Sequence, residues 1–158
     1  MPGRYESNPA EVVAGFVVYP KNEYVVEIQE PKGSEYNTKD GPKAGIRVNF
    51  RIADGEFKGK AVSYFGDELN DFGKAANKRL VMAALGYDTK EESEKKFNAE
   101  VVTGHSWGFN SDGSVDDGWL LMKGKAIIVD LDVNAATDGS GKQYQKFVSF
   151  RPYQPAAS

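Results

Sequence analysis

The chain has 158 residues, enough for one domain with a hydrophobic core but too few for two comfortable ones. It contains no cysteine, which excludes disulfides, thiolate metal ligands and a cysteine nucleophile, and which fits a reducing cytoplasm. Its formal net charge of −3 argues against a protein that coats polyanions through bulk charge alone. The apolar run at 12–19 falls well short of the roughly 20 residues that span a bilayer, so we expect a cytoplasmic protein without a membrane partner.

The charge is unevenly distributed along the chain. The stretch 32–64 carries seven Lys and Arg against four Asp and Glu, whereas 87–118 carries three against eight. A polyanion feels the local field within a Debye length of about 8 Å, not the sum over the molecule. The basic stretch therefore keeps polyanion binding open despite the acidic total.

The first predicted element is a strand at 23–31, preceded by an N-terminal arm or extra strand at 1–22. Tyr24, Val26 and Ile28 alternate with Glu27 and Gln29, the period of a half-buried strand. The next twelve residues, 32–43, are rich in Gly, Ser, Asn, Asp and Lys and predict a mobile, basic loop.

A second strand is predicted at 44–54, with Arg47 and Arg51 on its open face. The core face is formed by the alternate positions, Ile46, Val48, Phe50 and Ile52. The segment DGEFKG contains the Asp-Gly pair and the Gly that are typical of a hairpin connection. KAVSYF at 60–65 alternates again and is predicted as a third strand. Three strands with short connections indicate an antiparallel meander.

The period then changes to that of a helix at 70–85. The apolar positions recur at three- and four-residue spacing, and Asp67 or Asn70 can cap the start while Gly86 ends it. An acidic insertion at 87–118 follows, in which 89–97 can form a short charged helix. The remainder of the insertion predicts an irregular excursion.

A fourth strand is predicted at 124–134, a Gly- and Ser-rich turn at 135–143, a fifth strand at 144–151 and a disordered tail at 152–158. Three strands, a helix and two strands, with long loops after the first and fourth strands, match a five-stranded Greek-key barrel of the oligonucleotide-binding (OB) type over 23–151. A small β-sandwich or half-barrel with a packing helix remains the alternative fold.

Motifs for catalysis or metal binding are incomplete. GSGK at 139–142 lacks the other positions of a phosphate loop, and the odd-position oxygens of 110–116 lack the glycine and glutamate of a calcium loop. His105 is the only histidine, so an imidazole relay or a histidine metal cluster is excluded. We therefore expect no enzymatic activity, no cofactor and no metal.

Several segments resemble the small single-stranded DNA-binding proteins encoded by bacteriophages. These segments are EYVVEIQEP, GIRVNFRIADGEFKGKAVSYF, the helix ending MAALGY, and MKGKAIIVDLDVN followed by GKQYQKFVSFRP. The resemblance covers 23–151 and implies an OB fold that coats DNA exposed during replication or recombination, in the cytoplasm of a bacterial host. The acidic insertion has no counterpart in a minimal version of that fold, and the tail lacks the acidic tip through which bacterial members recruit partners.

The leading hypothesis is a non-enzymatic, sequence-tolerant protein that binds single-stranded DNA. Basic side chains would contact phosphates, and aromatic rings would stack on bases. The phosphate candidates are Lys43, Arg47, Arg51, Lys58, Lys60, Lys142, Lys146 and Arg151. The stacking candidates are Tyr36, Phe57, Tyr64, Tyr144 and Phe147. Single-stranded RNA binding, or a protein-interaction module that forms a homo-oligomer or binds replication or recombination proteins, are the open alternatives.

Overall fold

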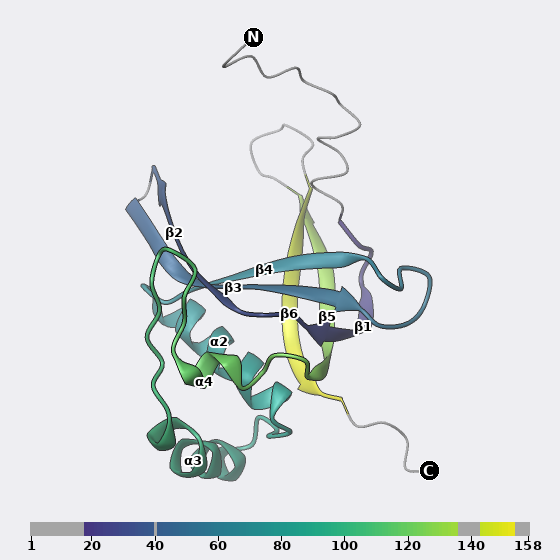
Figure 1. Cartoon of the computed structure of the whole chain (residues 1–158). Helices are drawn as coiled ribbons and strands as arrows, with labels where there is room; N and C mark the ends of the chain where they lie inside the picture. Colours follow the sequence, from purple (N-terminus) through teal and green to yellow (C-terminus); the bar gives the residue numbers. More distant parts are fainter. Residues whose placement is uncertain (1–17, 40, 136–142, 154–158) are drawn as a thin grey trace.

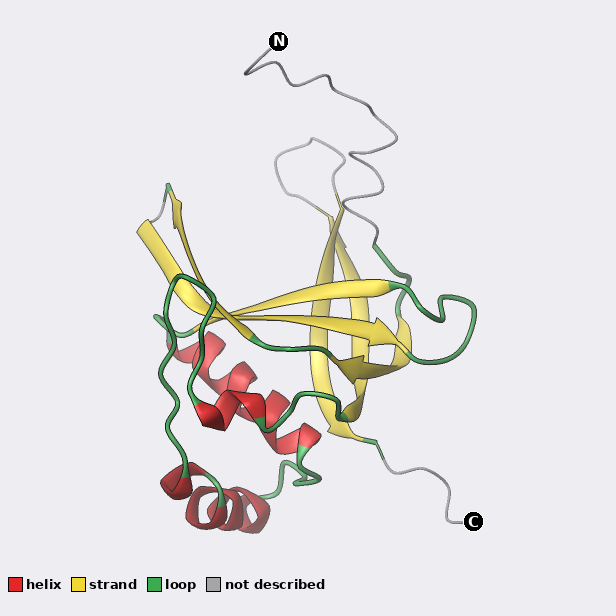
Figure 2. Ribbon diagram, in the orientation of Figure 1, coloured by secondary structure: helices red, strands yellow, loops and turns green. Residues whose placement is uncertain are grey.

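One antiparallel sheet of six strands forms the body of the protein, with helices on one side (Figures 1 and 2). The computed structural model describes residues 18–39, 41–135 and 143–153. The strands are β1 (Asn22–Ile28), β2 (Lys32–Thr38), β3 (Gly41–Ile52), β4 (Ala61–Asp67), β5 (Ala126–Ala135) and β6 (Gln143–Pro152). The helices are α2 (Asp71–Ala84), α3 (Glu91–Glu100) and α4 (Asp117–Leu120), with a 3₁₀ turn η1 (Val102–Gly104). The mainly β prediction is thus confirmed.

The long strand β3 joins the parts of the sheet. Residues 41–47 pair with β2, and residues 50–52 pair with β1. Because β4 pairs with 45–51 along the other edge, β1 and β2 share one edge of β3. On the far side of β1 the sheet continues to β5 and then β6. Through its pairing with β1, strand β3 therefore connects the basic β2–β4 region to the β5–β6 hairpin.

The hydrogen bonds do not close this sheet into a barrel. The sequence predicted closure, but the described strands pair in the order β2-β3-β1-β5-β6 with β4 on β3, and no pairing joins β4 to β6. Side chains meet there instead: the ring of Tyr64 lies 5.1 Å from that of Phe147 and 5.2 Å from that of Phe150. Aromatic packing rather than a backbone ladder thus joins the two edges.

Residues 32–38 form strand β2, where the sequence predicted a mobile loop. Glycine and small polar residues disfavour strands, but seven register pairs with β3, from Lys32↔Arg47 to Thr38↔Gly41, override that preference. Gly33 also meets the insertion, because its amide donates to the Gly113 carbonyl at 3.1 Å. Six strands therefore appear where five were expected.

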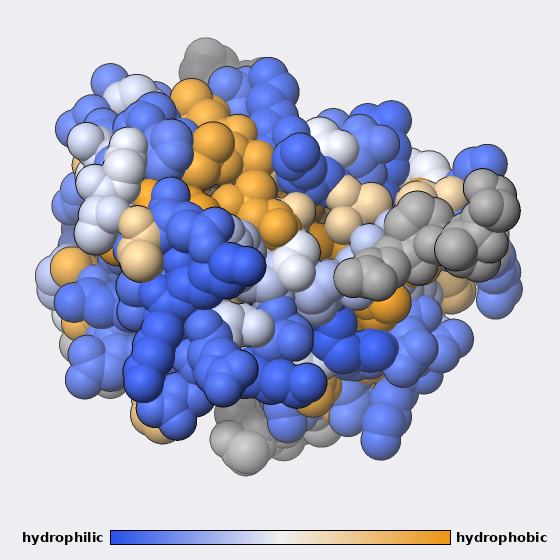
Figure 3. Space-filling model, turned by 90° about the horizontal axis from the view of Figure 1, so that it is seen from below, coloured by the Kyte–Doolittle hydropathy of each residue, from blue (hydrophilic) through white to orange (hydrophobic). Residues whose placement is uncertain are grey.

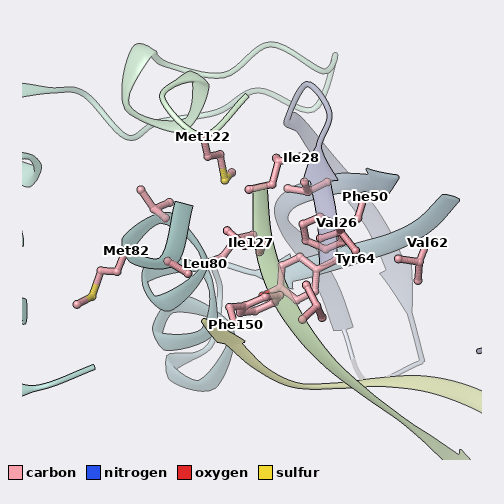
Figure 4. Packing of buried hydrophobic residues seen from close by; sticks show 14 of the residues in the cluster. Val26, Ile28, Phe50, Val62, Tyr64, Leu80, Met82, Met122, Ile127 and Phe150 are labelled. Carbon is pink, nitrogen blue, oxygen red and sulfur yellow. The ribbon is translucent and has the colours of Figure 1, made fainter. Parts of the chain in front are cut away.

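The core follows the predicted alternation of β3. Its four alternate apolar residues, Ile46, Val48, Phe50 and Ile52, are each at most 1% exposed. They pack with Tyr64 and Phe150 from β4 and β6 and with residues of α2, as the close view shows (Figure 4). This burial fixes the opposite face of β3 as the exposed one.

A bulge in β6 changes which residues face the core. Ser149 pairs with Asp130 while Phe147 pairs with Leu131, so Val148 is an extra residue without a partner in β5. Phe147 and Phe150 both turn inward as a result, although they are three residues apart. Val148 is 54% exposed.

The predicted helix at 70–85 is confirmed as α2. The Asn70 side chain caps it by accepting from the Gly73 amide at 2.7 Å, which satisfies one of the free first-turn donors. The short charged helix expected at 89–97 is also present, as α3. Of the predicted outer segments, 1–17 and 154–158 lie outside the described residues.

The rest of the insertion is ordered by its aromatic and acidic residues. Trp107 and Trp119 meet edge to face at 5.2 Å. His105 Nδ1 lies 2.7 Å from Asp117 Oδ2, and this contact is the main cause that lowers the pKa of the Asp117 carboxyl. An isolated bridge between Phe109 and Val115 closes a small hairpin, which lies against the outer edge of β2. The insertion therefore packs against the rest of the fold, while between η1 and α4 it has no regular element beyond this bridge, as the sequence predicted.

Candidate nucleic-acid interface

The exposed face of β2, β3 and β4 gathers the basic and aromatic residues that the sequence singled out. Directly opposed residues of antiparallel strands point to the same side. Arg47 is opposed by Lys32 and Phe65, and Tyr36 is opposed by Lys43. We call the charged and aromatic residues on this side, with Asn49 and Ser63, the Arg47 face: Glu27, Lys32, Tyr36, Lys43, Arg47, Asn49, Arg51, Ser63, Phe65 and Asp67.

An aromatic and cationic cluster occupies the middle of the Arg47 face. The Arg47 guanidinium carbon lies over the Phe65 ring, 5.3 Å from its centre, and Nη1 contacts Ser63 Oγ at 3.5 Å. Tyr36 meets Phe65 edge to face at 5.1 Å and is 42% exposed. The cluster presents one exposed ring beside a charged plane, and both can stack on an unpaired base.

Arg47 and Arg51 carry charge that no carboxylate of the described residues neutralises. Glu27 lies opposite Arg51 in register, yet no ion pair joins them. Lys32, on β2, is likewise exposed and outside the ion pairs of the described chain. These three cations can therefore meet an external anion without first breaking an internal ion pair.

Lys43 differs from its neighbours because Asp67 partly neutralises it. The Lys43 Nζ lies 3.4 Å from Asp67 Oδ2. The Leu69 amide, which donates to Asp67 at 2.9 Å, and the Lys43 ammonium both lower the pKa of the Asp67 carboxyl. A phosphate would compete with a stable carboxylate for Lys43.

Arg151 is still more firmly paired. It donates to both oxygens of Asp130, at 3.0 and 3.1 Å, and Nη2 lies 2.6 Å from Glu23 Oε1. Ser149 Oγ donates to the same Asp130 carboxylate. The structure thus places Arg151, predicted as a phosphate contact, in an ion-pair network on the outer side of β1, β5 and β6.

Three of the predicted stacking residues are built into the packing of the protein. Tyr64 is only 6% exposed and donates to Asn77 Oδ1 at 2.8 Å, so its ring is a core residue. Phe147 is half-buried and packs against Phe50 and Tyr64. Phe57 packs edge to face on Tyr19 at 5.0 Å, in a hollow that it shares with the carboxylates of Glu23, Asp54 and Glu56. The alternation of strands β4 and β6 turns Tyr64 and Phe147 inward, and the acidic surroundings of Phe57 disfavour phosphate.

The remaining candidates among the described residues are exposed but lie apart from the cluster. Lys58 and Lys60 belong to the turn between β3 and β4, beyond the Arg51 end of the Arg47 face. Tyr144, 52% exposed, and Lys146 lie on β6, on the side opposite to Phe147. Lys142 lies outside the described residues. The fold therefore brings together Tyr36, Lys43, Arg47 and Arg51 and leaves the β6 pair on a separate surface.

Phe65 and Lys32 are the aromatic and the basic residue of the Arg47 face that were not among the predicted site residues. The sequence KAVSYF could have predicted the outward position of Phe65. Side chains alternate along a strand, so apolar Val62 and Tyr64 face inward while polar Ser63 and Phe65 face outward. Lys32 had no such signal, since its segment reads as a loop. Its position becomes clear only from its pairing with Arg47.

Comparisons with known proteins do not assign the chain to a family. No protein-family model matches it, and a search of curated proteins gives no match either. In the described ranges, none of the helices combines the length and the apolar character that a membrane crossing requires.

Proposed function

We propose that the protein is a non-enzymatic, sequence-tolerant single-stranded DNA-binding protein that acts in phage DNA replication or recombination. The observation that carries the proposal is the cluster of Tyr36, Phe65 and Arg47 on an exposed sheet face. An exposed ring and uncompensated cations side by side match the two needs of single-strand binding, base stacking and phosphate tracking.

We further propose that the fold is an open variant of the OB type. Strands β1 and β2 then count as two halves of one first strand, because both pair along the same edge of β3. With α2 between β4 and β5, this counting supports the order of three strands, a helix and two strands. The Arg47 face then corresponds to the surface of the second and third strands, through which OB folds bind oligonucleotides.

In this proposal the single strand of DNA crosses β2, β3 and β4. Bases stack on Tyr36 and on the guanidinium plane of Arg47, each stack contributing roughly 1–3 kcal/mol. Lys32 and Arg51 contact the flanking phosphates and release counterions. Because neither contact reads base edges, binding tolerates any sequence and requires unpaired bases.

Fluorescence anisotropy with labelled oligo-dT across a salt series tests the proposal. Wild-type affinity should fall linearly on a log–log plot against salt, and Arg47→Glu combined with Arg51→Glu should abolish measurable binding. Lys95→Glu combined with Lys96→Glu is the matched control, because these exposed α3 lysines give the same change in net charge. Absence of wild-type binding at micromolar protein and low salt would sink the proposal.

A competition between matched DNA and RNA oligomers separates the two polymers. Stacking and phosphate tracking act on both, and only contacts near the 2′-hydroxyl distinguish them. The proposal expects unlabelled oligo-dU to displace the labelled probe at lower concentration than oligo-U, which has the same base. The reverse order would reassign the Arg47 face to RNA.

A further inference from the structure

Two apolar side chains stand out from the surface at the start of α2. Phe72 is 91% exposed and Leu69 is 57% exposed. Asp71, also exposed, lies between them in the sequence and adds a negative charge. We call Leu69 and Phe72 the Phe72 knob. A phenylalanine is among the residues most often buried, so this degree of exposure is unusual.

An apolar pocket of about 200 Å³ lies on another side of the same helix. Five apolar residues line it, Val81, Phe97, Val102, Trp107 and Trp119, and we call it the tryptophan pocket. Seen from the side of α3, hydrophobic residues gather in one region among hydrophilic ones (Figure 3). The volume is below the roughly 300–1,000 Å³ of small-molecule sites, so the pocket suits a single side chain better than a cofactor.

The pocket is pre-formed because hydrogen bonds hold both indole rings. Trp107 Nε1 donates to the Val102 carbonyl at 3.0 Å, and Trp119 Nε1 donates to the Trp107 carbonyl at 2.7 Å. A group that enters therefore meets fixed walls and orders few side chains. Glu68, Lys74, Lys78 and Asn98 also line the pocket. Glu68 accepts a hydrogen bond from Asn77 and Lys78 is paired with Glu94, whereas Lys74 has no ion pair within the described chain.

The knob and the pocket point in opposite directions. Phe72 and Val81 are nine residues apart, which is two and a half turns of an α-helix and places them on opposite faces of α2. A molecule cannot fill its pocket with its own knob. A contact between them must join two copies. Because the knob and the pocket point in opposite directions, two copies cannot exchange both contacts with each other, so the association is head to tail.

We propose that the Phe72 knob of one copy docks into the tryptophan pocket of the next. The chain supplies both halves: a single exposed ring fits the size of the pocket, and Asp71 beside the ring complements Lys74 beside the pocket. Each docked pair keeps one free knob and one free pocket, so copies add in a row. This inference stands independently of nucleic-acid binding, since neither surface includes the Arg47 face.

A complementation experiment without nucleic acid tests the contact. Phe72→Asp removes the knob and keeps the pocket, whereas Asn98→Phe places a ring inside the pocket from its α3 wall and keeps the knob. In sedimentation velocity, wild-type protein should grow in mass with concentration, and each variant alone should stay monomeric. An equimolar mixture should form dimers only, because it contains one usable knob and one usable pocket per pair.

Tryptophan fluorescence gives a second reading of the same event. The chain has only two tryptophans, and both line the pocket. The emission of wild-type protein should change with concentration, and that of Phe72→Asp should not. If circular dichroism shows that Asn98→Phe does not fold, Lys74→Glu replaces it, since a carboxylate there repels Asp71.

Three outcomes would overturn the inference: a wild-type protein that is monomeric up to millimolar concentration, Phe72→Asp that associates like wild type, or a mixture of folded variants that stays monomeric. Failure here leaves single-stranded DNA binding intact, because the anisotropy of Arg47→Glu with Arg51→Glu tests a different face. Loss of DNA binding would equally leave the contact between copies intact.

Discussion

Arg151 holds Asp130 with two parallel hydrogen bonds, whereas Arg47 lies over a phenylalanine ring with no carboxylate partner in the described chain. Both arginines come from exposed faces of strands, but only Arg47 has its charge available. The two residues are therefore expected to do different things when they are replaced.

Arg151→Gln should lower the free energy of unfolding by about 1 kcal/mol, the upper end for exposed ion pairs, because a bidentate contact within a network is lost. Arg47→Gln should change it by less than about 0.5 kcal/mol. In DNA binding the order reverses, with Arg47→Gln weakening the affinity for oligo-dT by up to the roughly 1–3 kcal/mol of one stacked base and Arg151→Gln leaving the affinity unchanged. Urea denaturation and the anisotropy salt series measure the two effects. Equal losses of affinity for both variants would contradict the distinction.

The same network predicts a loss of stability in acid. Arg151, followed by Ser149, lowers the pKa of the Asp130 carboxyl. A lowered folded-state pKa stabilises the protein above the unfolded value of about 3.9, and this contribution is lost as pH falls through the folded value. The melting temperature of wild type should drop below about pH 4, and Asp130→Asn should weaken that dependence. Glu35→Gln, on β2, serves as the control and should leave the drop of the melting temperature in acid unchanged.

Tyr64→Phe tests the placement of Tyr64 in the core rather than on the binding face. The variant leaves the buried Asn77 Oδ1 without its donor, which should cost about 1–3 kcal/mol in urea denaturation. The affinity for oligo-dT should stay within twofold of wild type. Tyr36→Ala should show the opposite pattern, with weaker binding and little change in stability. Weaker binding by Tyr64→Phe without a loss of stability would return Tyr64 to the stacking residues.

Gly33→Ala should displace the insertion from the edge of β2. An added Cβ would lie 2.1 Å from the Asn110 carbonyl oxygen, which belongs to the backbone and cannot rotate away. We expect faster hydrogen exchange of the amide at position 33, whose bond to Gly113 is lost, and a free energy of unfolding lower by about 1–3 kcal/mol. Gly104→Ala is the matched control, because nothing lies within 4 Å of its added Cβ. Unchanged exchange would mean that the hairpin moves with the new side chain.

The spacing of apolar residues along the sequence predicts the strands and helices that bury one face. In β3 the alternation of Ile46, Val48 and Phe50 with arginines is unambiguous, and in α2 the spacing of Leu80 and Ala83 together with the Asn70 cap gives both the helix and its start. These elements could be predicted because their own residues carry the signal. Strand β2 could not, because its stability comes from pairing with β3 and not from its glycines and polar residues.

The candidate site was predictable in part for the same reason. The outward direction of Arg47 and Arg51 follows from the alternation of β3 alone. Tyr36 was predicted as a stacking residue because it lies in a basic segment. Arg151 has the same outward parity in its strand, but its pairing with Asp130 depends on the register between β5 and β6, which a single strand does not encode. Distinguishing a free cation from a paired one therefore required the sheet.

The bulge at Val148 gives β6 one residue more than its pairing with β5 requires. Before it the even-numbered residues Tyr144 and Lys146 face outward, and after it the odd-numbered Ser149 and Arg151 do. Deleting this one exposed valine would leave a regular ladder, because Phe147 and Ser149 already pair with the adjacent residues Leu131 and Asp130. Phe147 and Phe150 would still face the core, and Ser149 and Arg151 would still face outward. A one-residue deletion in the regular strand β3, by contrast, would turn one half of that strand over and bury an arginine, so it should be far more damaging than the loss of Val148.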